Sequence, residues 1–135
     1  MRPSTHKEWL EVANERAADA QALLKDRQDS VGPVYMAGYV IECSLKAILQ
    51  RCGVAFPKAG QEGHNLRGLW KKANLRLTDV SDKAGEKAFF IEQWSTDLRY
   101  EVQPELGFPT EKLVRAAAQL SGWLQTQVRR RGGRL

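Results

Sequence analysis

The segment from residue 34 to residue 51 constrains the fold more than any other part of the sequence. Apolar residues would occupy nearly every side of a helix formed by this segment. They are Met36, Ala37, Val40, Ile41, Cys43, Leu45, Ala47, Ile48 and Leu49. A helix that is hydrophobic all round has to be covered by other elements. Pro33 suits the first turn of such a helix, and Gly53 follows its last residue. The sequence therefore predicts a central, buried helix over 34–51.

Helical periodicity also marks the two ends of the chain. Thr5 and Glu8 have the spacing of a capping box. Apolar residues then recur at intervals of three and four residues as far as about residue 28, which indicates a first helix. Thr110 is a suitable cap for a last helix, whose apolar stripe runs to Val128.

The middle of the chain predicts a loop and two further helices. Residues 54–63 are rich in Pro and Gly, which favours a loop, and a short helix is expected over about 65–73. Ser81 or Asp82 caps a fourth helix, which Pro104 interrupts. No segment shows the alternation of apolar and polar residues, bounded by hairpin turn residues, that is typical of β-strands. We therefore expect an all-α, up-and-down bundle of four long helices and one short helix.

Length and charge indicate one domain with a basic end. The 135 residues suit a single domain, and the formal net charge is +5. Four arginines lie in the last seven residues, where there is no acidic residue, so residues 1–128 carry only +1. We expect one domain over 1–128 and a basic tail over 129–135. The tail either keeps the terminus soluble or binds phosphate groups.

Several classes of protein are disfavoured by the sequence. No apolar run approaches the roughly 20 residues of a membrane span, and residues 1–10 have no signal-peptide core, so we expect a cytoplasmic protein that does not bind a membrane. Cys43 and Cys52 lie too far apart on one helix for a disulfide. His6 and His64 are isolated, and no nucleotide-binding loop occurs. We expect no metal and no cofactor.

The predicted central helix carries two charges that need partners. Glu42 and Lys46 stand four residues apart in the favourable order, on one line with Tyr35 and Tyr39. Charges in a buried helix are costly unless they are paired. The pair is either a structural ion pair at the edge of a cleft, or it lines a groove and orients another charged group. Under the second interpretation Glu42, Lys46 and Tyr39 are candidate ligand-binding residues.

A second polar cluster lies at the end of the predicted fourth helix. Arg99 comes just after the apolar stripe, and its guanidinium is suited to bidentate binding of a phosphate group, with Tyr100 beside it. Alternatively, Arg99 simply complements the helix dipole. His64 and Asn65 precede the short helix, where either residue acts as a cap or as a ligand-binding residue.

Three segments in this order resemble the HEPN domain family. They are Tyr39–Leu49 (YVIECSLKAIL), Gly63–Leu69 (GHNLRGL) and Leu98–Tyr100 (LRY), followed by a loop and a closing helix with the pair Trp123-Leu124. The resemblance covers roughly residues 8–125. It implies a helical bundle that commonly forms a homodimer. Many members work beside a small nucleotidyltransferase in toxin–antitoxin or related defence systems, and others bind nucleotides.

The resemblance also implies where catalysis would be found. Catalytic members are metal-independent RNases with an arginine that is followed, after four to six intervening residues, by a histidine. Arg99 matches the arginine, but the corresponding positions hold Pro104, Glu105 and Leu106. An imidazole is the side chain best suited to proton transfer near neutral pH. The sequence therefore argues against RNase activity. Tyr100 and Glu101 are the residues available to replace the missing catalytic histidine.

Three functional hypotheses follow. The first is a non-catalytic, dimeric domain that binds the phosphate group of a nucleotide or an RNA. Arg99 would clamp the phosphate, Glu42 and Lys46 would orient Arg99 or the ligand, and Tyr100 would pack on a base or sugar. The second is a metal-independent RNase that uses Arg99 with a replacement acid. The third is a protein-interaction module that docks a partner helix or a nucleotidyltransferase.

Overall fold

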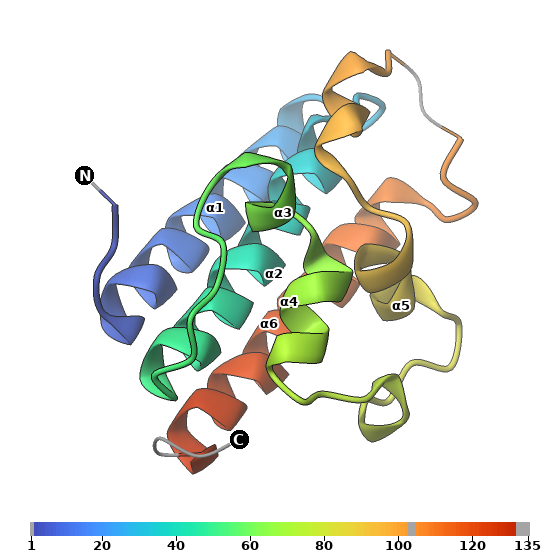
Figure 1. Ribbon diagram of the computed structural model, residues 1–135. Coiled ribbons are helices and arrows are strands. Elements are labelled where there is room, and N and C mark those ends of the chain that lie inside the picture. Colours follow the sequence, from blue (N-terminus) through green and yellow to red (C-terminus); the bar gives the residue numbers. More distant parts are fainter. Residues whose placement is uncertain (1, 103–104, 132–135) are drawn as a thin grey trace.

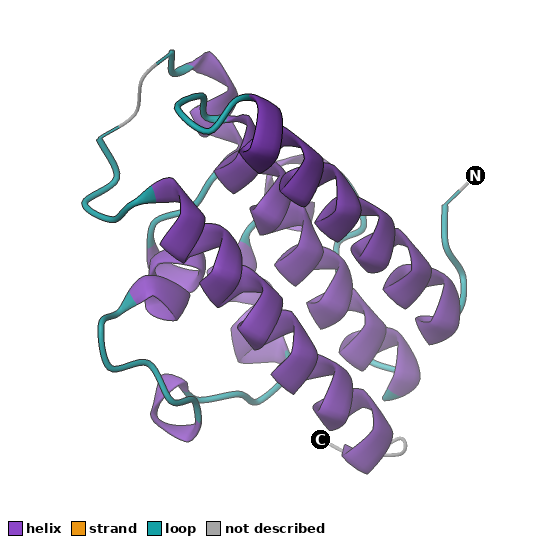
Figure 2. Cartoon of the chain, turned by 180° about the vertical axis from the view of Figure 1, so that it is seen from behind, coloured by secondary structure: helices purple, strands orange, loops and turns teal. Residues whose placement is uncertain are grey.

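The computed structural model describes residues 2–102 and 105–131, and every regular element in these ranges is a helix (Figure 1). Three long helices form one layer: α1 (His6–Asp26), α2 (Gly32–Arg51) and α6 (Thr110–Arg131). α2 lies between α1 and α6 and packs against both, as the view from behind shows (Figure 2). The predicted all-α fold is confirmed.

Local sequence chemistry sets the ends of α1 and α2. The side chain of Thr5 accepts a hydrogen bond from the backbone N–H of Glu8, and the Glu8 carboxylate accepts one from the backbone N–H of Thr5, each at 3.1 Å. This capping box satisfies two N–H groups that the helix leaves free. Pro33 stands in the first turn of α2, and Gly53, with a φ of 68°, follows its end.

Shorter elements cover one side of the long-helix layer (Figure 1). α4 (Leu66–Lys72) packs against α2, and α5 (Glu86–Glu92) packs against α4 and α6. The 3₁₀ helix η1 (Leu77–Asp79) lies between α4 and α5 in the chain. The predicted loop over 54–63 holds one helical turn, α3 (Gly60–Gly63).

The predicted fourth helix is divided in two. The sequence indicates one continuous helix from an apolar stripe of Phe90, Ile91, Trp94 and Leu98. In the structure α5 ends before Trp94, and a 3₁₀ helix, η2 (Thr96–Tyr100), follows. Trp94 is buried, and its Nε1 donates to the carbonyl of Val34 on α2 at 3.1 Å. Ser95 is extended and its hydroxyl caps η2, so the chain turns at this point to bring Trp94 onto α2.

α2 forms the centre of the core, as predicted. Every residue from Val40 to Leu49 is buried, including Glu42 and Lys46. Gly38 lets the Trp94 ring lie directly on α2, because a Cβ at position 38 would stand 1.8 Å from that ring. No helix in the described ranges combines the length and apolar character needed to cross a membrane.

The basic end of the chain is partly helical. α6 continues to Arg131, so three of the four arginines in the expected tail, Arg129, Arg130 and Arg131, belong to its last turn. Arg131 Nη1 donates to the carbonyl of Ala73 at 2.6 Å, which ties this turn to the end of α4. Arg134 lies outside the described residues.

Candidate functional site

Glu42 and Lys46 lie inside the protein, and each charge has a defined partner. Lys46 Nζ donates to Glu42 Oε2 at 3.0 Å, with side chains that are 1% and 5% exposed. The other carboxylate oxygen, Glu42 Oε1, lies 2.7 Å from His64 Nδ1. An ionised carboxylate only accepts hydrogen bonds, so Nδ1 carries the proton of this bond. The three side chains form a continuous network of ammonium, carboxylate and imidazole.

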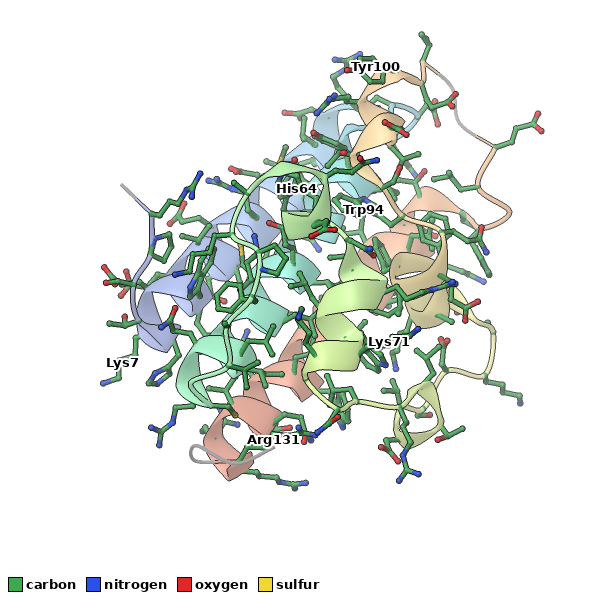
Figure 3. All side chains as sticks on the ribbon, viewed as in Figure 1. Lys7, His64, Lys71, Trp94, Tyr100 and Arg131 are labelled. Atoms are coloured by element: carbon green, nitrogen blue, oxygen red, sulfur yellow. The ribbon has the colours of Figure 1, made fainter. Side chains whose placement is uncertain are left out.

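The same network holds the connection between α2 and α4. Lys46 Nζ also donates to the carbonyl of Lys58 at 3.2 Å and lies 5.2 Å from the centre of a Trp9 ring. His64 follows α3 directly and fixes that turn to α2 through Glu42 (Figure 3). Hydrogen bonds therefore replace the water that both charges lose on burial, as buried charges require.

A row of aromatic side chains runs from this network towards one end of the molecule. The Tyr39 ring meets the rings of His64 and Trp94 edge to face, with centroid distances of 5.6 Å in both cases. The Tyr39 hydroxyl lies 3.1 Å from the Tyr35 hydroxyl. Burial raises the pKa of Tyr39 above its ordinary range, and the Tyr35 hydroxyl and the Glu42 charge add to this rise. Tyr39 therefore stays protonated at neutral pH.

Arg99 lies at the far end of the aromatic row, on η2, and its side chain is exposed. Arg99 Nη2 donates to the Tyr100 hydroxyl at 2.9 Å, and the guanidinium carbon lies 4.9 Å from the centre of the Tyr100 ring. The hydroxyls of Tyr100 and Tyr35 raise the pKa of Arg99. The charge of Arg99 opposes the burial-driven rise in the pKa of Tyr39. Arg99 is thus an exposed cation that neighbouring tyrosines hold in place.

A polar groove of about 290 Å³ lies between the α3–α4 turn and η2. Its lining residues are Gln61, Glu62, His64, Asn65, Trp94, Ser95, Thr96 and Asp97. His64 belongs both to this groove and to the buried network, and its side chain is 31% exposed. No residue in the described ranges makes a hydrogen bond with its Nε2, so this nitrogen is available to a ligand.

The structure brings four of the six predicted site residues together and places the other two further along the row. Tyr39, Glu42, Lys46 and His64 form one contact cluster. Glu42 and Lys46 contact His64 and the Lys58 carbonyl. No hydrogen bond or ion pair within the described residues joins them to Arg99, one of the two groups that the first hypothesis had them orient, the other being the ligand. Because Lys46 is 1% exposed, it acts on any ligand only through Glu42 and His64.

Sequence reasoning did not include Tyr35 and Trp94 among the site residues. The spacing of four residues placed Tyr35 on the same helix face as Tyr39. It did not indicate that Tyr35 links Tyr39 to Arg99. Trp94 was assigned to the core, and it is buried, yet it also lines the groove. The sequence did hold one signal for the position of Trp94. Gly38 is a glycine within an otherwise apolar helix, which indicates that another side chain packs closely against the helix at that point.

The described residues offer no metal centre. No group of three His, Cys, Asp or Glu side chains within 2–102 and 105–131 is placed to hold a metal ion. Of the positions where the family's catalytic histidine is expected, Pro104 lies outside the described residues, Glu105 is exposed and Leu106 is half-buried.

The fold and the site define a small all-helical domain with a charged residue pair buried in its central helix and an exposed arginine at one end. The sequence profile of the HEPN domain matches residues 6–125, and the chain belongs to the HEPN domain family. The family membership predicted from the three sequence segments is thereby confirmed. No curated protein and no solved structure matched the chain.

Proposed function

We propose that this HEPN domain is a non-catalytic, homodimeric module that binds the phosphate group of a nucleotide or an RNA through Arg99. The observation that carries the proposal is the exposed guanidinium held by Tyr100 and Tyr35. An arginine that is already oriented loses less side-chain entropy on binding than a free one. Nη2 donates to Tyr100, which leaves the remaining N–H groups of the fork for phosphate oxygens.

The surroundings of Arg99 suit the rest of a nucleotide. Tyr100 is 72% exposed, so its ring offers an aromatic surface to a base or sugar beside the phosphate. The groove next to η2 adds hydroxyl, amide and carboxylate groups together with the free Nε2 of His64. A ligand that places its phosphate on Arg99 and its base in this groove would use both features.

Two parts of the proposal come from family membership. Members of the family commonly form homodimers, and many work beside a small nucleotidyltransferase in toxin–antitoxin or defence systems. We therefore propose a homodimer and a nucleotidyltransferase-type protein partner. Light scattering at micromolar concentration tests the first, and a mass corresponding to one chain would contradict it.

Isothermal titration with nucleotides and a short RNA tests the phosphate site. We expect saturable binding that Arg99→Ala weakens at least tenfold, as the loss of a charge-assisted bidentate contact implies. Arg99→Lys should restore only part of the affinity, because lysine lacks the planar fork. Arg27→Ala is the matched control, since Arg27 is also exposed and lies directly after α1. No saturable binding, or equal losses in Arg99→Ala and Arg27→Ala, would contradict the proposal.

One observation favours metal-independent RNase activity as a second candidate function. His64 Nδ1 is bonded to a buried carboxylate, its Nε2 has no hydrogen-bond partner within the described ranges, and the residue lines the groove, which suits an oriented acid–base imidazole. Nε2 would take the proton of an RNA 2′-hydroxyl as its oxygen attacks the phosphorus. The bond from phosphorus to the 5′-oxygen would then break, and the proton would pass to that oxygen. Arg99 would stabilise the charge on the phosphate.

A cleavage assay in EDTA separates the two candidates. The second predicts metal-free cleavage that is lost in both His64→Gln and Arg99→Ala. Intact RNA, together with binding that depends on Arg99, would exclude the second candidate and support the first. Neither cleavage nor binding would favour the protein-interaction module. That hypothesis expected Arg99→Ala chiefly to lower stability, whereas the exposure of Arg99 predicts a change within about 0.5 kcal/mol.

A further inference from the structure

The positive charge of this protein is concentrated at one end. Four segments lie at this end: the first turn of α1 and the last turn of α2 on one side, residues 69–79 at the end of α4 and in η1 on the other, and the last turn of α6 between them (Figure 1). We call this the basic end. Among the described residues of these segments, the cations are Lys7, Arg51, Lys71, Lys72, Arg76, Arg129, Arg130 and Arg131, and the carboxylates are Glu8 and Asp79; Glu62 lines one hollow with Lys72.

Contacts bring these segments together. Arg131 Nη1 bonds to the Ala73 carbonyl, which joins the end of α6 to the end of α4. The pKa of His6 at the start of α1 is lowered, first by burial and then by the charges of Arg51 and Lys7, so the cation at the end of α2 acts on the start of α1. Figure 3 shows Lys7, Lys71 and Arg131 on the half of the molecule away from Tyr100.

The rest of the described chain is slightly acidic. Of 21 Lys and Arg residues, eight lie at the basic end, Arg134 lies outside the described ranges, and the other 12 share the molecule with 14 of the 16 Asp and Glu residues. Around Arg99 the carboxylates outnumber the cations: Asp97 and Glu101 flank Arg99 in the chain, and Asp26, Arg27 and Asp29 line one hollow with Val102. A long polyanion is therefore attracted more strongly to the basic end than to the end that holds Arg99.

Complementing helix dipoles does not account for this concentration. One basic residue near a helix C-terminus suffices for that effect, which fades within the last turn. α6 ends in three consecutive arginines, of which only Arg131 bonds to a backbone carbonyl. Arg129 and Arg130 are exposed, and no ion pair involves them within the described ranges.

We propose that the basic end binds the phosphate backbone of a nucleic acid, independently of its sequence and of the Arg99 site. Binding of this kind needs closely spaced cations and no apolar surface. An anionic membrane would also require apolar side chains that insert, and a protein partner would require an apolar interface core. The exposed large hydrophobic residues in the described ranges, Tyr100 and Val102, both lie outside the basic end.

Fluorescence anisotropy with a labelled single-stranded RNA and a labelled DNA duplex, each of about 20 nucleotides or base pairs, tests the proposal across salt concentrations. If the single strand makes about six phosphate contacts, log K falls with log salt at a slope of about −4. Arg129→Gln/Arg130→Gln should weaken binding at least tenfold and make the slope shallower by about 1.4. Binding of both the single-stranded RNA and the DNA duplex would support a site for the phosphate backbone, whereas binding of only one of the two probes would contradict it.

The control removes the same charge from the other end of the same helix. Lys112 and Arg115 on α6 are exposed, and Lys112→Gln/Arg115→Gln should leave the affinity within about twofold of wild type. Equal losses of affinity in the two double variants would show that only net charge matters, and would overturn the assignment of binding to the basic end. So would binding to anionic vesicles without binding to nucleic acid, or no binding at about 50 mM salt, the low end of the range in which backbone binding is strong.

Arg99→Ala separates this inference from the proposed function. It should weaken nucleotide binding in titration at least tenfold and leave the affinity for the DNA duplex, measured by anisotropy, unchanged. RNA binding that Arg99→Ala abolishes, and that Arg129→Gln/Arg130→Gln spares, would overturn the inference and keep the proposed function. RNA binding that Arg129→Gln/Arg130→Gln abolishes, and that Arg99→Ala spares, would support the inference and contradict RNA binding through Arg99.

Discussion

Glu42→Gln removes one charge from the buried network and leaves its shape nearly unchanged. The glutamine side chain oxygen can still accept from His64, but Lys46, at 1% exposure, would be left without a carboxylate partner. Breaking a buried ion pair by removing one partner costs about 3–5 kcal/mol, because the remaining charge stays desolvated. We therefore expect Glu42→Gln to lower the free energy of unfolding by about this amount.

The effect is large enough to measure by two methods. With the usual entropy of unfolding per residue, a loss of 3–5 kcal/mol in a chain of this length lowers Tm by about 10–18 °C. Denaturant unfolding followed by tryptophan fluorescence gives the free energy directly. Because the network holds both Lys58 and His64, we expect the connection from 54 to 65 to loosen first.

Two further variants make the reasoning refutable. Glu42→Gln/Lys46→Met removes both charges and should recover most of the lost stability, since an apolar replacement for a buried pair is often neutral or stabilising. Asp19→Asn breaks an exposed pair with Arg16, at 2.9 Å, and should cost about 0.5 kcal/mol or less. If Glu42→Gln cost no more than Asp19→Asn, Lys46 would have to reach water, and the description of a buried network would be wrong.

Two other predictions concern packing and pH. Gly38→Ala should cost about 3 kcal/mol or more, because the new Cβ would stand 1.8 Å from the Trp94 ring, whereas Gly122→Ala on α6, with open space at its Cβ, should stabilise by about 0.5–1 kcal/mol; chemical denaturation of both variants measures the difference. Burial raises the pKa of Cys43 to about 12, with the Glu42 charge adding to it, from an ordinary 9.0. The unfolded thiol ionises first as pH rises, so this thiol's contribution to stability is present below about pH 9 and is lost between about pH 9 and 12. Comparison with Cys43→Ala across that range checks the sign, and a wild-type curve parallel to that of Cys43→Ala would contradict it.

The sequence predicted the long helices well because their signals are local. A capping box, a proline in a first turn and a glycine after a last turn act within a few residues of each boundary. The central position of α2 also followed from its own composition, since a helix without a polar side has to be enclosed. The division of the fourth helix did not follow, because its cause lies on α2, where Gly38 and the Val34 carbonyl receive Trp94.

The candidate site shows the same distinction between local and distant information. Spacing alone placed Tyr39, Glu42 and Lys46 on one line, because residues four apart share a helix face. It could not show that His64 takes the second oxygen of Glu42, since these residues are 22 positions apart and are joined by a loop. It could not link Arg99 to Tyr35 for the same reason.

The two oxygens of Glu42 connect the stability of the fold to the groove. Oε2 binds Lys46, which is 1% exposed and lies in the interior, whereas Oε1 binds His64, which lines the groove. Stability alone would be served as well by an apolar pair in α2. Retaining a buried carboxylate makes physical sense where its charge also orients a group at the surface, here the His64 imidazole. The effect of Glu42→Gln on ligand binding, measured in the stable Lys46→Met background, therefore reports on function separately from folding.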